Sequence, residues 1–272
     1  MHTIKFHPLI LTALLLTPFL ASAESDHCKA KNIELWTKAS YATDGSNLII
    51  QGKRVRLIGL HSPQRERKQK FNSPGEPLAK ESKMFFNKLL ANNDLEVGVE
   101  YDETKVDRLG RQLVHLFLKD GSSIQKRILE SGYAINRPAN NNNKYAKCYF
   151  EAEQRARADK VNLWGFLEKY PDFHFPLAIS SELNSQDKGF RIIQGKVVKV
   201  TKNANHYIIN MDTTGIRIPK KHWDKFNYKE IQKLLGLTIE VRGMAYLFRG
   251  VMFMMVEEPN SIDRFNPIAK PL

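Results

Sequence analysis

A run of basic residues in the first third of the chain, with acid–base groups inside it, is the part of the sequence best suited to chemistry. Between positions 53 and 70 there are seven basic residues and one acid: Lys53, Arg54, Arg56, Arg65, Arg67, Lys68 and Lys70, with Glu66 as the acid. His61 lies within the same run, and an imidazole titrates in the range that acid–base catalysis needs. This density of cations favours a polyanionic ligand such as a nucleic acid backbone, and it is equally consistent with a solvated surface loop.

The elements expected around these residues form a compact α+β unit. Alternating apolar and polar positions predict two strands between residues 33 and 50, joined at the turn Asp44-Gly45, and a third strand over 55–60. Arg56 lies in this third run and Arg111 opens a later one, so both arginines are expected to project from rigid elements. The remaining expected elements are a helix over 78–90, strands over 95–101 and 112–118, and helices over 123–131 and 145–160.

The last third of the chain has a different pattern. Residues 168–189 are rich in Pro, Ser, Asp and Asn and show little periodicity, which predicts a linker. Residues 190–272 contain short strand-like runs and one helix candidate over 223–235, which predicts a small β-rich domain, such as a barrel of the oligonucleotide/oligosaccharide-binding (OB) type. Its aromatic residues, interleaved with basic ones, would suit a single-stranded ligand and are equally consistent with a core: Trp223, Phe226, Tyr228, Tyr246 and Phe248.

Composition and charge restrict the class of protein and of partner. The 272 residues are 42% hydrophobic and 26% charged, which supplies a core and excludes a fully disordered chain. The net charge is +13. Residues 24–187 carry 26 basic and 22 acidic side chains, whereas residues 188–272 carry 15 and 7, so the C-terminal part is the more basic, at +8 against +4. The excess favours polyanionic partners, such as nucleic acid, anionic lipid headgroups or cell-wall polymers.

Residues 1–23 have the layout of a cleaved export signal. Lys5 precedes an apolar stretch, and the small residues Ala21-Ser22-Ala23 follow it. The apolar stretch is interrupted by Thr12, Thr17 and Pro18 and is shorter than the roughly 20 residues of a spanning helix. We therefore expect cleavage near Ala23, no transmembrane segment, and export to a periplasm or to the medium.

The sequence contains two cysteines, Cys28 and Cys148. In an oxidising compartment, an even pair that is far apart in sequence predicts one disulfide, here joining the N-terminus to the body of the domain. Two unrelated buried thiols are the alternative. Neither cysteine has the neighbours of a zinc site.

Four short strings, in this order, resemble the staphylococcal-nuclease-like (thermonuclease) family. They are Asp44-Gly45-Ser46-Asn47, Val55-Arg56-Leu57-Ile58-Gly59-Leu60-His61-Ser62-Pro63-Gln64, Asp107-Arg108-Leu109-Gly110-Arg111, and Gly132-Tyr133-Ala134 with Asn162-Leu163-Trp164. The resemblance implies a thermonuclease-like domain over residues 24–167, built as a five-stranded OB-type β-barrel with three helices. It also implies that residues 190–272 form a second small β-barrel, as in some exported members.

The resemblance implies a site as well. The family cleaves phosphodiesters of DNA and RNA with a calcium ion, two arginines and three carboxylates. Arg56 and Arg111 stand at the two arginine positions, where a planar guanidinium grips phosphoryl oxygens and stabilises the charge that builds on them. Ser46 and His61 stand where the family has metal-binding aspartates, and Gln64 stands where it has the glutamate thought to position or activate water.

These replacements predict a site that holds phosphate and has lost hydrolytic power. Ca²⁺ prefers carboxylate oxygens, so its binding at Ser46 and His61 is expected to be weak or absent. Gln64 cannot act as a general base at neutral pH. The sequence therefore predicts an exported protein that binds nucleic acid, either DNA or RNA and single strands included, with reduced or absent nuclease activity.

Two alternatives stay open from the sequence. One is an active phosphodiesterase with a non-standard site that uses His61 or Glu66. The other is an envelope module whose barrels bind a protein or a wall polymer. The oligomeric state is left open.

Overall fold

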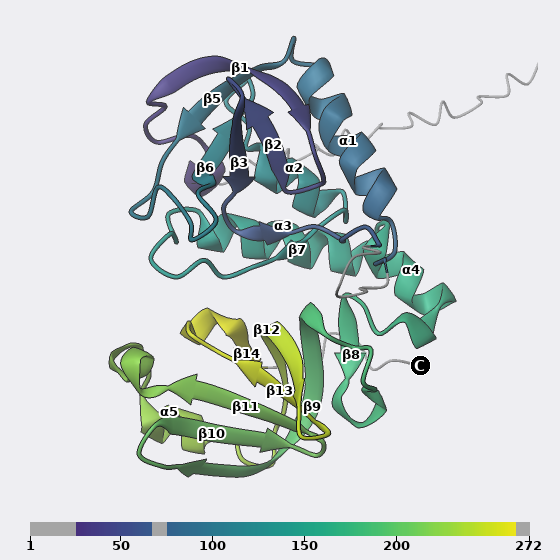
Figure 1. Cartoon of the computed structure of the whole chain (residues 1–272), viewed down its shortest axis with the longest axis vertical. Helices are drawn as coiled ribbons and strands as arrows, with labels where there is room; N and C mark the ends of the chain where they lie inside the picture. Colours follow the sequence, from purple (N-terminus) through teal and green to yellow (C-terminus); the bar gives the residue numbers. More distant parts are fainter. Residues whose placement is uncertain (1–25, 67–74, 265–272) are drawn as a thin grey trace, which may run out of the picture.

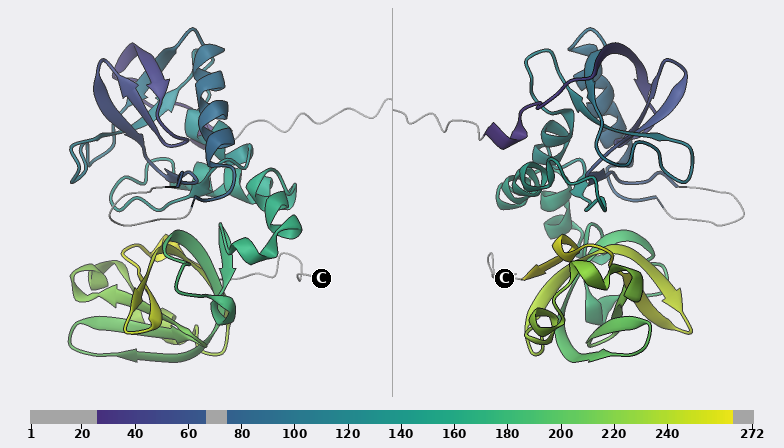
Figure 2. Two further views of the ribbon diagram at one scale, coloured as in Figure 1. Left: turned by 45° about the vertical axis from the view of Figure 1, so that its right-hand side comes forward. Right: turned by 90° about the vertical axis from the view of Figure 1, so that its left-hand side faces the viewer.

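The chain folds into two β-barrels, which we call the first and the second barrel. The computed structural model describes residues 26–66 and 75–264, so the expected export signal lies outside the described residues. The first barrel and its helices occupy the upper part of Figure 1, and the second barrel lies below them. Figure 2 shows the same two-part arrangement from two further sides.

The first barrel is a closed ring of five strands. Its order is β1-β2-β3-β6-β5, in which only β3 and β6 are parallel. The strands are β1 (Leu35–Ala42), β2 (Asn47–Ile50), β3 (Lys53–Leu57), β5 (Glu96–Glu100) and β6 (Gln112–Phe117). A short pair outside the ring joins β4 (Leu60–His61) to β7 (Ile135–Asn136). The predicted α+β class and five-stranded OB-type barrel are confirmed.

Helices flank this barrel. The three expected helices are present as α1 (Ala79–Ala91), α2 (Ile124–Glu130) and α3 (Ala146–Ala158), and a fourth, α4 (Leu163–Lys169), follows them. Side chains alternate between the two faces of β3. Val55 and Leu57 are buried inside the barrel, whereas Arg54 and Arg56, which precede them in turn, point away from the barrel interior. Both arginine side chains of this strand are thereby presented on its outer side.

A disulfide fastens the N-terminal end of the described chain to α3. Cys28, at the end of the 3₁₀ helix η1 (Asp26–Cys28), is bonded to Cys148, with 5.2 Å between their Cα atoms. Both cysteines are buried. The predicted disulfide is confirmed.

The second barrel has the same strand order as the first. Pairing of β12 with β9 closes a ring β9-β10-β11-β13-β12, in which β11 and β13 are parallel. Its strands are β9 (Gly189–Lys202), β10 (His206–Met211), β11 (Thr214–Pro219), β12 (Thr238–Phe248) and β13 (Val251–Met255), with β14 (Ile262–Arg264) added beside β12. The predicted second OB-like domain is confirmed.

Two segments of this part differ in detail from the expected pattern. Within the expected linker 168–189, β8 (Leu177–Ile179) pairs in parallel with β9, between the 3₁₀ helices η2 (Pro171–Phe173) and η3 (Ser180–Glu182). The expected helix over 223–235 is split into η4 (Lys220–Lys225) and α5 (Tyr228–Gln232). The split occurs because Phe226 is extended and the Asn227 side chain caps α5 by accepting a hydrogen bond from Lys229 N.

The junction between the barrels combines an apolar cluster with buried ion pairs. The cluster joins both parts through Ile135, Ala156, Trp164, Phe190 and Ile192. Beside it, the fully buried side chain of Arg242 on β12 contacts the buried carboxylate of Glu153 on α3 at 3.1 Å. Arg157 on α3 donates from both terminal nitrogens to the two carboxylate oxygens of Glu240 on β12, each at 2.9 Å.

No helix in the described part of the chain is long and apolar enough to cross a membrane.

Candidate functional site

One carboxylate ties together the turn between β1 and β2. Oδ1 of Asp44 accepts hydrogen bonds from the backbone N of Ser46 at 2.8 Å and of Asn47 at 2.9 Å, and from the Ser46 hydroxyl at 2.9 Å. Ser46 is fully buried, and Ser62 Oγ donates to its Oγ at 3.1 Å. A Cβ on Gly45 would lie 1.8 Å from a hydroxyl oxygen of α1, so only glycine fits at this position of the turn without a shift of its neighbours. The Ser46 hydroxyl therefore faces the protein interior.

Arg111, just before β6, is held from two sides. Its Nε and Nη2 lie 2.8 Å and 2.6 Å from Oδ2 of Asp107. Burial alone would raise the pKa of Asp107, but the hydrogen bonds from Arg111 lower it below its ordinary value. Nη1 of Arg111 donates to Oδ1 of Asn47 at 3.1 Å, and Asn47 is the β2 neighbour of Arg56 in the sheet. The structure thus brings the two predicted arginines together beside the β1–β2 turn.

A third arginine joins them. Burial, followed by the positive charges of Arg137 and Arg111, lowers the pKa of Arg56 to about 10. Nη2 of Arg56 is buried and, within the described residues, has no hydrogen-bond partner. Burial and the charge of Arg111 also lower the pKa of Arg137, which follows β7. We call Arg56, Arg111 and Arg137 the arginine cluster.

His61 on β4 is covered by the second barrel. It is 8% exposed, and its ring centre lies 5.0 Å from that of Phe190 on β9. Its Nε2 lies 3.7 Å from Oε2 of Glu76, which is within ion-pair distance and beyond a hydrogen bond. Burial lowers the pKa of His61, although the Glu76 carboxylate acts in the opposite direction. The imidazole is therefore neutral at neutral pH.

The other predicted site residues are not drawn into the cluster. Gln64 turns back on its own loop, where its Nε2 donates to the Ser62 carbonyl at 2.8 Å and its backbone N donates to Glu76 at 2.7 Å. Lys53 and Arg54 on β3 are exposed, as are Arg65 and Glu66. Arg67, Lys68 and Lys70 lie outside the described residues.

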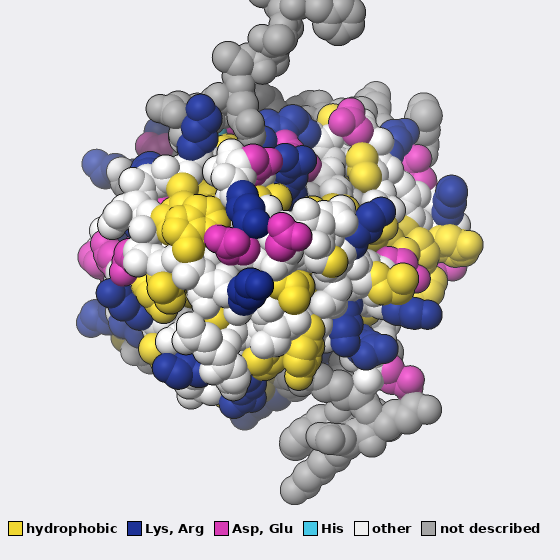
Figure 3. Space-filling view, turned by 90° about the horizontal axis from the view of Figure 1, so that it is seen from above, with side chains coloured by type: hydrophobic (Ala, Val, Ile, Leu, Met, Phe, Trp, Pro, Cys, Tyr) yellow, Lys and Arg dark blue, Asp and Glu magenta, His cyan; other side chains and the backbone are white. Residues whose placement is uncertain are grey.

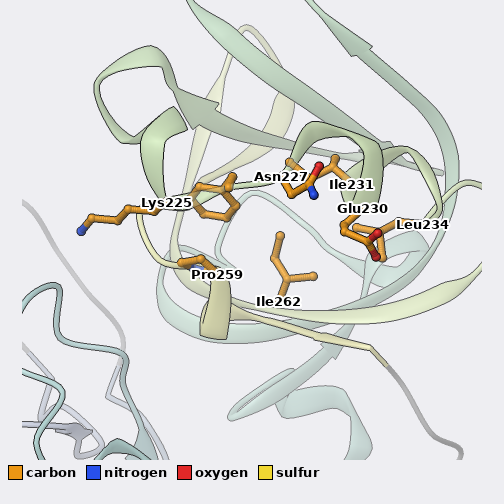
Figure 4. Close-up of a pocket in the computed structure, with 8 residues that line it drawn as sticks. Lys225, Asn227, Glu230, Ile231, Leu234, Pro259 and Ile262 are labelled. Atoms are coloured by element: carbon orange, nitrogen blue, oxygen red, sulfur yellow. The ribbon is translucent and has the colours of Figure 1, made fainter.

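The upper face of the first barrel shows no comparable concentration of basic side chains among the described residues (Figure 3). Seen from above, on the side of the first barrel away from the second, Lys and Arg side chains are scattered among acidic and hydrophobic ones (Figure 3). A pocket of the second barrel, mostly apolar, lies between α5 and the 3₁₀ helix η5 (Pro259–Ser261) (Figure 4). None of the predicted catalytic residues lines that pocket.

Comparison with known proteins agrees with the geometry of the first barrel. The model of the family described as staphylococcal nuclease homologue matches residues 54–165. A thermonuclease of Staphylococcus intermedius is 32% identical over 125 residues, which cover 44% of this chain and 71% of that protein. The chain belongs to the staphylococcal nuclease family. The family model ends before the second barrel.

Two further relatives from the comparison bear similar names. A thermonuclease of Staphylococcus hyicus is 26% identical over 164 residues, covering 57% of this chain and 94% of that protein. Endonuclease YncB of Bacillus subtilis is 30% identical over 133 residues, covering 45% of this chain and 58% of that protein.

The residues that the resemblance places at the family's metal positions do not fit a calcium ion. Ca²⁺ takes about six to eight oxygen ligands, mostly carboxylates. Here Ser46 offers a buried hydroxyl, His61 offers a nitrogen, and Oδ1 of Asp44 already accepts the hydrogen bonds of the turn. Within residues 26–66 and 75–264, no group of three or more His, Cys, Asp or Glu side chains is arranged to hold a metal.

Three residues next to this site were missed from the sequence. Arg137 reaches the cluster because β7 pairs with β4, a contact between segments more than 70 residues apart. Glu76 stands just before the expected helix over 78–90, where the sequence predicted no element, and Phe190 covers His61 only because the two barrels pack together. Arg137 lies two residues after the short apolar run Tyr133-Ala134-Ile135, which is only a weak sequence signal for a strand.

Proposed function

We propose that this protein binds the phosphodiester backbone of nucleic acid at the arginine cluster, with reduced or absent hydrolysis. The observation that carries the proposal is the buried Nη2 of Arg56, which has no hydrogen-bond partner among the described residues and lies beside two further guanidinium groups. A buried donor that lacks a partner is costly, and a charged one more so. A phosphate oxygen would supply the missing acceptor.

The charge balance of the cluster supports an anionic ligand. Asp107 pairs closely with Arg111. Only longer-range attraction acts on the other two arginines, from Asp44 and Asp107 on Arg56 and from Glu257 and Asp107 on Arg137. The lowered pKa of Arg56 records how unfavourable its charge is in this environment. A phosphodiester bound here would offset that repulsion, and guanidinium groups suit it because they can form two parallel hydrogen bonds.

The contacts of the residues at the substituted positions support the expectation of weak hydrolysis. Ser46 and Gln64 are engaged in hydrogen bonds within their own loops, and His61 is closed in by Phe190. General-base help alone contributes about 10² to 10⁴ in rate. Losing that help together with the metal would leave positioning and charge stabilisation by the arginines.

A second candidate is an active phosphodiesterase with an unusual base. The observation in its favour is the approach of Glu76 to His61 at 3.7 Å, a carboxylate–imidazole pair near the arginine cluster. It predicts turnover that survives chelation and is lost in His61→Ala or Glu76→Ala. A base supplied by Glu66 would instead make Glu66→Ala the inactive variant.

Export is part of the proposal. The leader-like residues 1–23 and the disulfide between Cys28 and Cys148 support folding in an oxidising compartment. Nucleic acid would then be met outside the cytoplasm.

Binding is tested by fluorescence anisotropy of the purified protein with a labelled 20-nucleotide single strand in chelator. Hydrogen bonds to charged groups contribute about 1.5–3 kcal/mol, so Arg56→Ala is expected to weaken affinity about tenfold or more. Arg56→Lys keeps the positive charge but lacks the planar guanidinium that forms two parallel hydrogen bonds, so it should recover only part of the lost affinity. Arg155→Ala removes an exposed cation on α3 and serves as the matched control. Equal affinities of all four proteins would refute binding at this cluster.

Turnover is measured in the same preparation with Ca²⁺, Mg²⁺ or chelator. We expect binding under all three conditions with little cleavage. Strong Ca²⁺-dependent cleavage that Arg56→Ala abolishes would overturn the expected loss of activity while leaving the binding site in place. Cleavage in chelator that His61→Ala or Glu76→Ala removes would establish the second candidate.

A further inference from the structure

One outer face of the second barrel carries rings and cations in register. Strand pairing places Lys199, Asn210, Gly215, Phe253 and Tyr246 side by side in one row across β9, β10, β11, β13 and β12. These four pairs of strands are neighbours in the lower part of Figure 1. The residues between the row members along the strands point inward, as shown by the buried side chains of the barrel core. The row therefore lies on the outside of the barrel.

A second row runs parallel to the first. It contains Thr201, Ile208, Arg217, Met255 and Met244 on the same five strands. Neither row contains an acid, whereas each contains one cation. We call these two rows, together with the β12–β13 hairpin tip, the aromatic face.

The ring of Phe253 is built into the centre of this face. A Cβ on Gly215 would lie 2.6 Å from that ring, so the glycine lets the ring lie close against β11. The Arg217 guanidinium lies 4.8 Å from the Phe253 ring centre and is held by a 2.9 Å hydrogen bond to Oδ1 of Asn210. Tyr246 lies next to Phe253, with 6.1 Å between ring centres and an angle of 26° between their planes.

Several of these side chains are open to solvent. Met244 is 50% exposed, Tyr246 is 38% exposed and Phe248, at the hairpin tip, is 55% exposed. Arg249 lies over the Phe248 ring at 5.3 Å, which adds a cation at the tip. Large apolar side chains gathered on one open face mark a binding surface more often than isolated ones do.

We propose that the aromatic face binds single-stranded nucleic acid. Bases would stack on Tyr246 and Phe253, and the phosphates would be near Lys199, Arg217 and Arg249. Aromatic platforms with flanking cations are sequence-tolerant sites for single strands, since every base has a flat face. The +8 charge of residues 188–272 and the absence of acids in both rows favour this anionic ligand over an apolar protein partner.

The aromatic face leads toward the arginine cluster. Glu257 follows Met255 just beyond the end of β13, and its charge acts on Arg137. A strand lying along β13 would thus pass from the stacked rings toward the first barrel. The proposal goes beyond the proposed function, because stacking on this face does not require that the arginine cluster bind anything.

The test compares affinities of the full protein for a labelled 20-nucleotide single strand. Stacking of a base on an aromatic ring contributes substantial binding free energy for any base, so Tyr246→Ala is expected to weaken binding about fivefold or more. Tyr246→Phe keeps the ring and should bind about as tightly as the unchanged protein. Tyr41→Ala, which removes a 54% exposed tyrosine from the first barrel, is the matched control. Thermal melting of each variant verifies that it is folded.

A second ligand separates stacking from charge. Heparin is a polyanion without bases, so Tyr246→Ala should change the affinity for heparin by no more than about twofold. Arg217→Gln should lower the affinity for both heparin and the single strand. Unchanged single-strand affinity in Tyr246→Ala, or equal losses for heparin and DNA, would overturn the proposal. Failure of the arginine cluster is distinguishable, since Arg56→Ala would then have no effect while Tyr246→Ala still weakened single-strand binding.

Discussion

The two barrels follow the same path and yet present different chemistry. In each, counting ring strands only, the third strand pairs in parallel with the fifth, and a helix lies between the third and the fourth: α1 in the first barrel and α5 in the second. The first barrel gathers guanidinium groups beside its first turn, whereas the second exposes rings on its outer face. The shared fold therefore says little about function, which depends on the side chains placed on it.

The first turn of each barrel shows the difference most clearly. Both turns are held by a side-chain oxygen that accepts two backbone hydrogen bonds: Asp44 accepts from Ser46 and Asn47, and Asn203 accepts from Asn205 and His206. The Asp44 turn is packed under α1, whereas Asn203 is exposed. The same local solution serves a buried corner in one barrel and a free hairpin in the other.

The largest expected effect concerns the ion pair that joins the barrels. Arg242→Met leaves the fully buried Glu153 carboxylate without its cationic partner, so the free energy of unfolding should fall by about 3–5 kcal/mol. Burial would lower the pKa of Arg242, but Glu153 and Asp263 raise it above its ordinary value, which shows how strongly these carboxylates favour the charge. Urea unfolding followed by circular dichroism measures the change.

A double variant and a surface control make this prediction specific. Arg242→Met with Glu153→Gln removes both charges and should recover part of the lost stability. Arg155→Met, on the exposed side of α3, should change stability by no more than about 0.5 kcal/mol. If Arg242→Met also had so small an effect, the barrels would be two independent units that merely touch.

The disulfide should stabilise the first barrel in particular. Replacing Cys28 and Cys148 together by Ala is expected to lower the free energy of unfolding by about 2–5 kcal/mol, because the bond closes a long loop. Hydrogen exchange measured by mass spectrometry should rise most in η1 and α3, the two elements that the bond joins. Loss of protection mainly in the second barrel would contradict this assignment.

The strands and helices could be predicted because their signals are local, whereas the five-stranded first barrel was what the resemblance implied. Leu48 and Ile50 alternate with outward residues along β2, and Val55 and Leu57 do the same along β3, so periodicity alone indicated the elements and their inner faces. The resemblance, and not periodicity, implied that Arg56 and Arg111 serve one site. What local signals cannot give is the partner of a short strand.

The missing parts of the site depend on such long-range contacts. Arg137 enters the cluster through the two-residue pairing of β7 with β4, which is too short to leave a periodic pattern. The cover over His61 comes from Phe190, so it depends on how the barrels pack. Strand β8 was not predicted within the expected linker, because a strand of three residues is too short to show a recognisable alternation of apolar and polar positions.

A smaller effect should separate the two first turns. Asp44→Ala removes a charged acceptor of several hydrogen bonds and is expected to cost about 2 kcal/mol of stability, whereas Asn203→Ala should cost about 1 kcal/mol or less. Thermal unfolding of the two variants side by side gives the comparison, with each serving as control for the other. Equal losses would mean that burial under α1 adds nothing to the first turn.

The smallest effect is a pH dependence located in the first barrel. Burial lowers the pKa of both His61 and His115 below the ordinary value of 6.5 in the folded protein. The unfolded chain therefore binds more protons in that range, so stability should be full above pH 6.5 and decrease as the pH falls through the lower folded values. Burial would raise the pKa of Asp102, but hydrogen bonds from His115 and nearby backbone lower it to about 2. Protonation of this carboxyl would therefore reduce stability only below about pH 3.8. Urea unfolding between pH 8 and 5 should thus show a slope that His61→Gln reduces, and an unchanged slope in that variant would show that this imidazole does not titrate on unfolding.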